Sequence, residues 1–340
     1  MKSSIDNGPA RDEQLEAPKL LEQSLFEIKR VIAGQEPMLE RVFVALLANG
    51  HVLIEGVPGL AKTLTVKTLA DVLGGSFQRI QFTPDLVPSD LVGTRIYRPD
   101  NGRFDTELGP VFCNFLLADE INRAPAKVQS ALLEVMQERQ VTIGSQTHAV
   151  PDPFLVLATQ NPIESEGTYP LPEAQVDRFM MKIVVDYPTY GQERTVVDRS
   201  LGTPPTLRQV LSLESLRAYQ HEVRDVYVDP QVADYAVTLT VATRHPEKCG
   251  LEALKPYISF GASPRGSIYL VHTARALALL RGRRYVLPAD VRELSHDVLR
   301  HRMVLSYQAL AEQVSADEIL DKIIAAVTAP QIELARERVA

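Results

Sequence analysis

Short apolar runs alternate with helical patterns in the first part of the chain. Strands are predicted where several apolar residues follow one another, at 51–56, 77–82, 114–119, 154–159 and 179–185. Helices are predicted where apolar residues recur every three or four positions, at 20–34, 36–50, 60–73 and 126–139. Apolar strands alternating with helices are typical of a parallel sheet that is covered on both faces. The pattern therefore predicts an α/β core around a parallel five-stranded sheet.

Two segments interrupt this alternation. Residues 83–112 are rich in proline and glycine, and residues 140–150 (QVTIGSQTHAV) are predicted to form a hairpin about Gly144–Ser145. Both segments could be plain loops, but long ordered loops in compact domains are more often functional.

The second part of the chain has a different pattern of apolar residues. A linker is indicated by GTPPT at 202–206, and only helices are predicted beyond it, at 212–223, 229–245, 263–280, 288–302 and 317–327. Asp229-Pro230 and Ser263-Pro264 each supply an N-cap residue followed by proline at the first helical position. We therefore expect a flexible tail over 1–19, an α/β core over 20–205 and an all-helical lid domain over 206–340.

The segment GVPGLAKT at 56–63 lies directly after a predicted strand and opens a predicted helix. It matches a phosphate-binding P-loop except that alanine stands before the lysine, where glycine is usual. Backbone N–H groups of such a turn bind phosphate oxygens together with the helix N-terminus. Lys62 is expected to reach the β- and γ-phosphates, and Thr63 to hold Mg²⁺. The predicted nucleotide-binding residues are Gly56, Val57, Pro58, Gly59, Leu60, Ala61, Lys62, Thr63 and Leu64.

Two adjacent carboxylates end the buried run NFLLADE at 114–120. Asp119 is expected beside the P-loop, as a nucleotide-binding residue and second Mg²⁺ ligand, and Glu120 as the general base that polarises the attacking water. The alternative is an acidic strand end that merely caps the next helix.

Three further polar residues are candidates for catalysis. Asn161 follows another strand, where it would lie beside Glu120 and orient the water or contact the γ-phosphate. Arg178 precedes the strand at 179–185, and its alternative role is a surface ion pair with Asp177. Arg265 lies in the first turn of a predicted lid helix, where a cation is unfavourable unless an anion such as phosphate binds there.

Composition narrows the classes of partner. The chain has 36 basic and 43 acidic residues, a net charge of −7, so no global attraction to nucleic acid or anionic membrane is expected. Cys113 and Cys249 are too few for a disulfide framework, and His245 with Cys249 does not fill a metal site. Because no long apolar stretch and no leader pattern are present, we expect a cytoplasmic protein without a membrane span.

Together, GVPGLAKT, LLADEINRAP, ATQNPIESEGTYPLPEAQVDRF and GASPRG resemble the MoxR family of AAA+ ATPases, over about residues 20–335. The resemblance implies a P-loop core with a helical lid, assembled as a hexameric ring that uses ATP and Mg²⁺. It implies that Arg178 is the arginine finger, Arg265 the lid's sensor arginine and Asn161 the polar sensor. The residues expected to contact adenine are Val31, Ile32, Gly34 and Gln35.

The resemblance also implies a helix insert within 83–112, an extra hairpin at 140–150 and a chaperone-like remodelling function. Partners with a von Willebrand factor A domain are implied as well. Two other functions stay open: a nucleotide-gated binding module with little turnover, and a helicase or loader acting on DNA. Glu120 and Arg178 argue against the first. The net charge argues against the second, since RGRRY at 281–285 is the only basic cluster.

Overall fold

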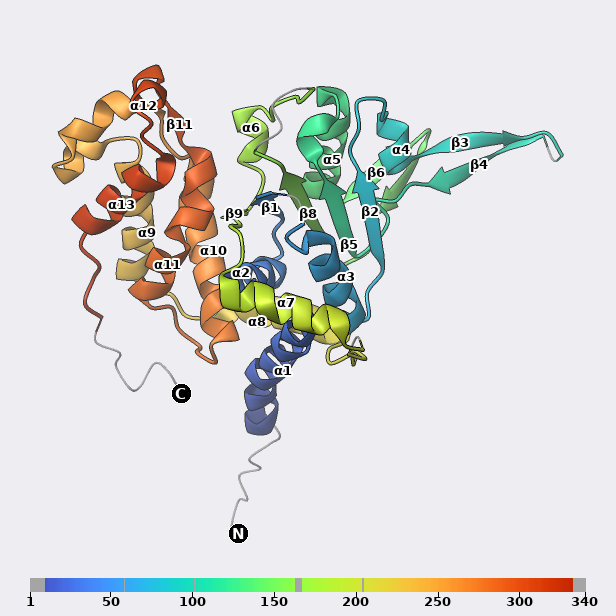
Figure 1. Ribbon diagram of the computed structural model, residues 1–340, viewed down its shortest axis with the longest axis horizontal. Helices are drawn as coiled ribbons and strands as arrows, with labels where there is room; N and C mark the ends of the chain where they lie inside the picture. Colours follow the sequence, from blue (N-terminus) through green and yellow to red (C-terminus); the bar gives the residue numbers. More distant parts are fainter. Residues whose placement is uncertain (1–9, 58, 101, 163–166, 204, 333–340) are drawn as a thin grey trace, which may run out of the picture.

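The computed structural model describes residues 10–57, 59–100, 102–162, 167–203 and 205–332 (Figure 1). Its centre is a five-stranded sheet in the order β2-β5-β8-β1-β9, in which every neighbouring pair is parallel. The strands are β1 (Val52–Glu55), β2 (Phe77–Gln81), β5 (Phe115–Asp119), β8 (Leu155–Gln160) and β9 (Met181–Val184). All five predicted strands and the predicted parallel sheet are confirmed.

Alternate residues of the strands feed two separate hydrophobic cores. Phe115 and Leu117 of β5 belong to a core shared with the helices on one face, whereas Leu116 and Ala118 belong to the core on the other face. This follows from the two-residue period of a strand. The helices of this domain are α1 (Ala10–Val31), α2 (Glu36–Leu47), α3 (Lys62–Leu73), α5 (Ala126–Glu138), α6 (Glu173–Val176) and α7 (Tyr190–Leu201).

Helix α1 begins at Ala10, so its first turns lie within the segment 1–19 that was expected to be a flexible tail. Residues 10–17 (ARDEQLEA) are mostly good helix formers with few apolar positions, and a search for apolar periodicity therefore misses them.

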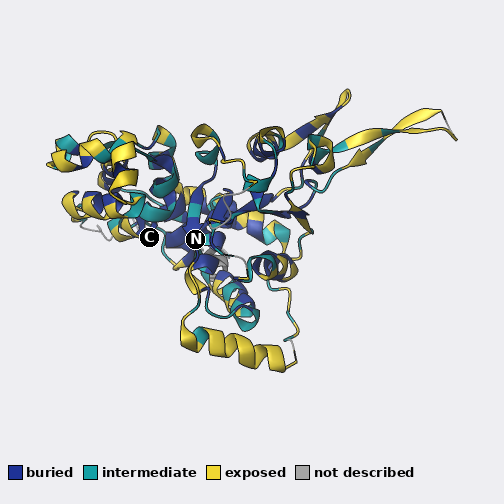
Figure 2. Ribbon diagram, turned by 45° about the horizontal axis from the view of Figure 1, so that its top comes forward, coloured by how far each residue is buried: buried dark blue, intermediate teal, exposed yellow. Residues whose placement is uncertain are grey.

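Both interrupting segments contain a hairpin. The segment 83–112 forms α4 (Pro88–Val92) followed by the antiparallel strands β3 (Gly93–Arg98) and β4 (Arg103–Leu108), which project from the domain (Figure 1). Figure 2 shows that this hairpin is mostly exposed, which explains why its sequence carries no alternating apolar pattern. The hairpin predicted at 140–150 is confirmed as β6 (Gln140–Ile143) and β7 (Gln146–Ala149).

The described part of the second domain is mostly helical and contains one small β-ladder. Its helices are α8 (Leu213–Asp225), α9 (Pro230–Ala242), α10 (Pro264–Leu280), α11 (Pro288–Leu299), α12 (Tyr307–Ala311) and α13 (Ala316–Ala326). Strands β10 (Ile258–Phe260) and β11 (Val304–Leu305) pair antiparallel, which the sequence did not predict. The predicted N-caps are confirmed, since Asp229 and Ser263 accept from the backbone N–H groups of Gln231 and Arg265.

This lid lies beside the edge strand of the sheet (Figure 1). Helix α11 and the short 3₁₀ helix η4 (Arg300–Arg302) contact β9, and α10 contacts α2. The part of the chain that the structure describes contains no helix apolar and long enough to cross a bilayer.

Candidate functional site

The P-loop connects the end of β1 to the start of α3 at Lys62. Gly59 has φ +87°, and Ala61 has φ +56°, a left-handed conformation that costs a non-glycine residue about 1 kcal/mol or more. A Cβ on Gly56 would lie 2.6 Å from the carbonyl oxygen of Val185, so this position has no room for a side chain. Pro58 lies outside the described residues.

A cavity of about 430 Å³ opens over this turn, and we call it the P-loop cavity. It brings together most of the predicted site residues. Its lining is Gly56, Gly59, Leu60, Ala61, Lys62, Thr63, Leu64, Arg79, Gln81, Asp119, Glu120, Thr159, Gln160 and Asn161. Val57 is partly buried against the core instead. The carboxyl ends of four parallel strands thus meet at one cavity, as expected for an open α/β sheet.

Lys62 is held close to the loop that it follows. Its Nζ donates to the carbonyl oxygen of Gly56 over 2.5 Å. Burial lowers the pKa of Lys62, and the carboxylates of Asp119, Glu120 and Glu55 oppose this shift. The carboxylates near the ammonium group of Lys62 therefore favour its charged form.

Thr159 connects the two strand-end acids. Its hydroxyl donates to Asp119 Oδ1 over 2.6 Å and accepts from the backbone N–H of Glu120 over 2.8 Å. Glu120 has φ +56°, so this hydrogen bond fixes a backbone conformation that a non-glycine residue rarely adopts. Sequence reasoning missed Thr159, although its place near the end of β8, two residues before Asn161, was a usable signal.

Side chains from β2 and from the turn after β5 complete the polar network. Arg79 Nη2 donates to Asp119 Oδ2 over 2.6 Å, and Gln81 Nε2 donates to Glu120 Oε2 over 2.8 Å. Arg123 Nη1 also donates to Glu120 Oε2, over 3.1 Å. Sequence reasoning did not identify Arg79, Gln81 or Arg123.

The donor atoms in the P-loop cavity suit Mg²⁺ and a nucleotide triphosphate. The Thr63 hydroxyl and the Asp119 carboxylate are hard oxygen donors, and Mg²⁺ prefers one or two such protein ligands together with substrate phosphates. The described residues contain no cluster of three or more His, Cys, Asp or Glu able to enclose a metal ion.

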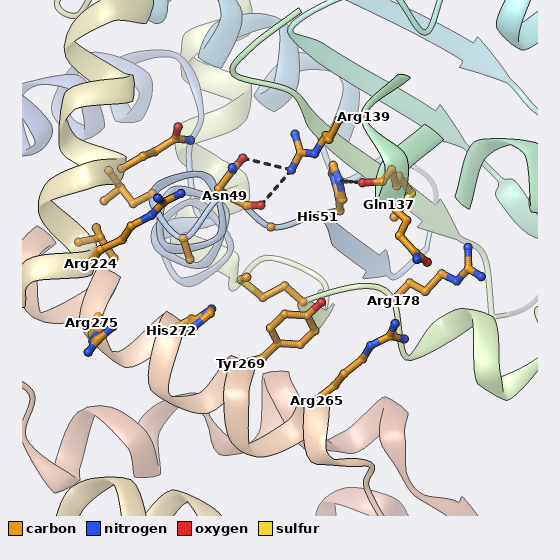
Figure 3. A pocket seen from close by; sticks show the side chains of 17 residues that line it. Asn49, His51, Gln137, Arg139, Arg178, Arg224, Arg265, Tyr269, His272 and Arg275 are labelled. Atoms are coloured by element: carbon orange, nitrogen blue, oxygen red, sulfur yellow. Dashed lines mark hydrogen bonds between the residues drawn. The ribbon is translucent and has the colours of Figure 1, made fainter. Parts of the chain in front are cut away.

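A second cavity, of about 360 Å³, lies between the core and the lid, and we call it the arginine cavity (Figure 3). The arginines and histidines that line it are Arg139, Arg178, Arg224, Arg265, Arg275, His51 and His272. None of the described residues that line it is Asp or Glu. Figure 3 shows Arg178 and Arg265 at one end of this cavity and Arg224, His272 and Arg275 at the other.

Arg178 does not form the ion pair with Asp177 that was considered for it. Arg178 Nη1 donates to the carbonyl oxygen of Leu133 over 3.2 Å. Asp177 instead pairs with Arg265, at 3.3 Å between Oδ2 and Nη1, and with Arg302, at 3.0 Å between Oδ1 and Nε.

Arg265 does not line the P-loop cavity of its own chain, so its contact with ATP as the lid's sensor arginine stays a prediction. The physical reason is the position of the lid beside β9, which directs the first turn of α10 towards Arg178. No described lid residue lines the P-loop cavity.

The residues expected at adenine lie elsewhere too. Val31 and Ile32 pack on the core, and Gly34 lies against Gln192 of α7. Neither these three residues nor Gln35, which is buried at the start of α2, line the P-loop cavity, and their contact with adenine stays a prediction.

Comparison with known proteins shows similarity along most of the chain. Residues 51–181 match the model of the ATPase family associated with various cellular activities, and residues 252–323 match its lid domain. Chaperone MoxR1 of Mycobacterium tuberculosis is 57% identical over 312 residues, which cover 92% of this chain and 83% of that protein. Protein MoxR of Methylorubrum extorquens is 32% identical, over 89% of this chain and 93% of that protein.

A crystal structure from Cytophaga hutchinsonii, of a protein described as an inferred ATPase, superposes with a TM-score of 0.89. It is 47% identical and covers 95% of this chain and 98% of its own. The fold and the relatives therefore agree on one family.

Proposed function

The chain belongs to the MoxR family of AAA+ ATPases, and from this premise we propose that it hydrolyses ATP in a closed ring of identical subunits to remodel other proteins. One observation carries the proposal: the phosphate-binding lysine, the two strand-end acids and a buried asparagine meet in a single cavity.

Different residues of the P-loop cavity bind the phosphates and the metal ion in phosphoryl transfer. The turn at Gly59–Ala61 and Lys62 bind the β- and γ-phosphates of ATP. Thr63 and Asp119 would hold Mg²⁺, which, when bound, neutralises charge on the phosphate oxygens.

Glu120 accepts the proton of the attacking water, and the hydrogen bond from its backbone N–H to Thr159 fixes its position. Asn161, which is 8% exposed and lines the same cavity, orients that water or the γ-phosphate.

The arginine cavity supplies the second half of a composite site. Arg178 and Arg265 lie together in a cavity whose described lining has no carboxylate, so this surface is suited to an anion. Neither arginine lines the P-loop cavity of its own chain, whereas a head-to-tail interface would bring the P-loop of a neighbouring subunit to them. In this arrangement Arg178 is the arginine finger and Arg265 the sensor, both acting on a neighbour's ATP. We expect a hexamer, with von Willebrand factor A domain proteins as candidate partners.

The projecting hairpin β3–β4 is proposed to contact client proteins, together with the hairpin β6–β7. Tyr97, Phe104 and Leu108 of β3–β4 are each about half exposed. The guanidinium of Arg95 lies 5.1 Å from the centre of the Phe104 ring, so the exposed surface combines aromatic and cationic groups. Exposed aromatic side chains grouped on one hairpin are typical of an interaction surface.

Two substitutions test the proposed ATPase. Glu120→Gln removes the base but keeps the phosphate contacts, so ATP should bind and persist while steady-state turnover is lost. Lys62→Ala removes the cation from the phosphates, so tight ATP binding itself should be lost. Both are measured by nucleotide titration and phosphate release, with Glu214→Gln, an exposed carboxylate outside both cavities, as the control. Wild-type turnover in Glu120→Gln would remove Glu120 from the role of base, and unchanged affinity in Lys62→Ala would contradict the P-loop assignment.

A further inference from the structure

Arg302 is a buried arginine whose side chain holds the segment that carries Arg178. The Arg302 side chain has 0% exposure, and Arg302 ends η4 of the lid. Its Nη2 donates to the carbonyl oxygens of Phe179, over 2.5 Å, and Asp177, over 3.2 Å. Its Nη1 donates to the carbonyl oxygen of Met180 over 3.3 Å. One guanidinium of the lid therefore binds three carbonyl groups on either side of Arg178.

The carboxylate of Asp177, a residue of the core, also binds side chains of the lid. Its Oδ1 pairs with Arg302 Nε at 3.0 Å, and both of its oxygens accept from the Ser263 hydroxyl, over 3.1 and 3.0 Å. Arg265, two residues further along the lid, donates to its Oδ2 over 3.3 Å. Asp177 is thus shared by two separate parts of the lid while its backbone neighbour is Arg178.

Tyr269 of α10 completes this arrangement. The guanidinium carbon of Arg302 lies 4.9 Å from the centre of the Tyr269 ring, and Tyr269 lines the arginine cavity next to Arg265 (Figure 3). Burial lowers the pKa of Arg302 to about 10 and Asp177 opposes this shift, so the group stays charged at neutral pH. The planar fork of arginine, which lysine lacks, is what allows several carbonyl groups to be bound at once.

We propose that Arg302 and Asp177 are positioning residues that couple the lid to Arg178, so that a shift of the lid moves the arginine offered to the neighbour's ATP. The inference rests on the proposed function of Arg178 and adds to it a means of regulation. A rigid connection is needed because a misplacement of about 1 Å at a catalytic group costs about 10²-fold in rate. A buried ion pair is in itself weak evidence for a stabilising role, since well-packed apolar side chains often do as well.

The test compares ATP turnover with ATP affinity in the assembled protein. Arg302→Lys keeps the charge and loses the fork, and we expect turnover to fall about 10²-fold while the Kd for ATP changes less than about twofold. Asp177→Asn combined with Arg302→Met removes both charges together, which avoids an unpaired buried charge and provides a second variant if Arg302→Lys folds poorly.

The matched control is another ion pair of the lid. Arg283 donates to both carboxylate oxygens of Asp290, over 2.7 and 2.6 Å, and the Asp290 side chain is 2% exposed. Replacing this pair by methionine and asparagine should lower the melting temperature without the loss of turnover. An equal loss of turnover in the control would reduce Arg302 to a structural role and overturn the inference.

A double-mutant comparison isolates the connection to Arg178. If Arg302 acts only through Arg178, Arg302→Lys should cause no further loss of single-turnover rate in an Arg178→Ala background. A full further loss there, or wild-type turnover in folded Arg302→Lys and in the double replacement, would overturn the coupling while leaving the arginine finger intact. Wild-type turnover in Arg178→Ala alone would instead contradict the proposed role of Arg178, and the coupling would fail with it.

Discussion

The two cavities of this chain differ in the charged residues that line them. In the P-loop cavity the acids and bases are mixed, and Asp119 and Glu120 each accept hydrogen bonds from side chains of the same cavity. In the arginine cavity five arginines and two histidines meet, and no carboxylate lines it within the described ranges. A mixed site can bind phosphate, hold a metal and activate water, whereas a surface whose charged lining residues are cationic stabilises negative charge.

This difference explains why, in the proposed mechanism, one subunit alone does not hold a complete ATPase site. In the proposed mechanism the first cavity supplies the base and the phosphate-binding lysine, and the second supplies arginines that do not line the first cavity. Head-to-tail association in the proposed ring would join these two halves, and such heterologous contacts close into rings when the rotation permits.

Arg178→Ala carries the largest expected effect. An arginine finger contributes about 10³–10⁵-fold to the rate and little to ground-state affinity. Turnover should therefore fall by that order while a nucleotide titration gives the wild-type Kd. Arg208→Ala, at an exposed arginine outside both cavities, serves as the control and should keep turnover.

Mixing two inactive variants tests whether Arg178 acts on the ATP of a neighbouring subunit. In a ring of Arg178→Ala and Glu120→Gln subunits, some interfaces combine the base of the first with the arginine of the second. Partial recovery of ATPase activity is expected there. The trans role is refuted if activity does not return although subunit exchange is demonstrated, or if a monomer has full activity.

The P-loop cavity was largely predictable from the sequence, and the arginine cavity was not. Parallel strands bring their carboxyl ends to one edge, so the topology alone places Lys62, Asp119, Glu120 and Asn161 together. Thr159, Arg79 and Gln81 were missed because each matters through a hydrogen bond to one of these residues, and no motif marks such a partner.

The position of Arg265 depends on contacts that are distant in sequence. Arg302 lies 125 positions from Asp177, and the packing of the lid on β9 brings them together. A local pattern predicts the helix and its N-cap, as at Ser263, but it does not say against which surface the helix packs. The sequence therefore predicted the lid helix and its basic first turn, but not that Arg265 lies beside Asp177.

Thr159→Val should have an intermediate effect, confined to the P-loop cavity. The substitution keeps the shape and removes the hydroxyl that connects Asp119 to the backbone of Glu120. Losing a partner that orients such a group typically costs about 10–100-fold in activity. We expect turnover to fall by that factor while ATP binding persists. Thr238→Val, on the exposed face of α9, is the isosteric control, and equal turnover in both variants would mean that Thr159 does not fix Glu120.

The smallest expected effect concerns His51, which lines the arginine cavity. Its Nδ1 accepts from the backbone N–H of Val156 over 3.0 Å, and its Nε2 lies 3.1 Å from the carbonyl oxygen of Met136. Burial, and then the charge of Arg139, lower the pKa of His51 to about 3, from an ordinary value of 6.5. The ring is therefore neutral in the folded protein at any pH at which the P-loop cavity would work.

A depressed pKa in the folded state makes stability depend on pH with a definite sign. The unfolded chain binds a proton at His51 below pH 6.5 and the folded chain does not, so this contribution is lost as pH falls from 6.5 towards 3. Between pH 7 and pH 5 the wild type should lose about 2 kcal/mol more unfolding free energy than His51→Gln, in which other groups titrate alike. Urea unfolding at both pH values and one fixed protein concentration measures this difference. Equal losses in the two proteins would show that His51 is protonated as easily in the folded state, and that the arginine cavity does not hold it neutral.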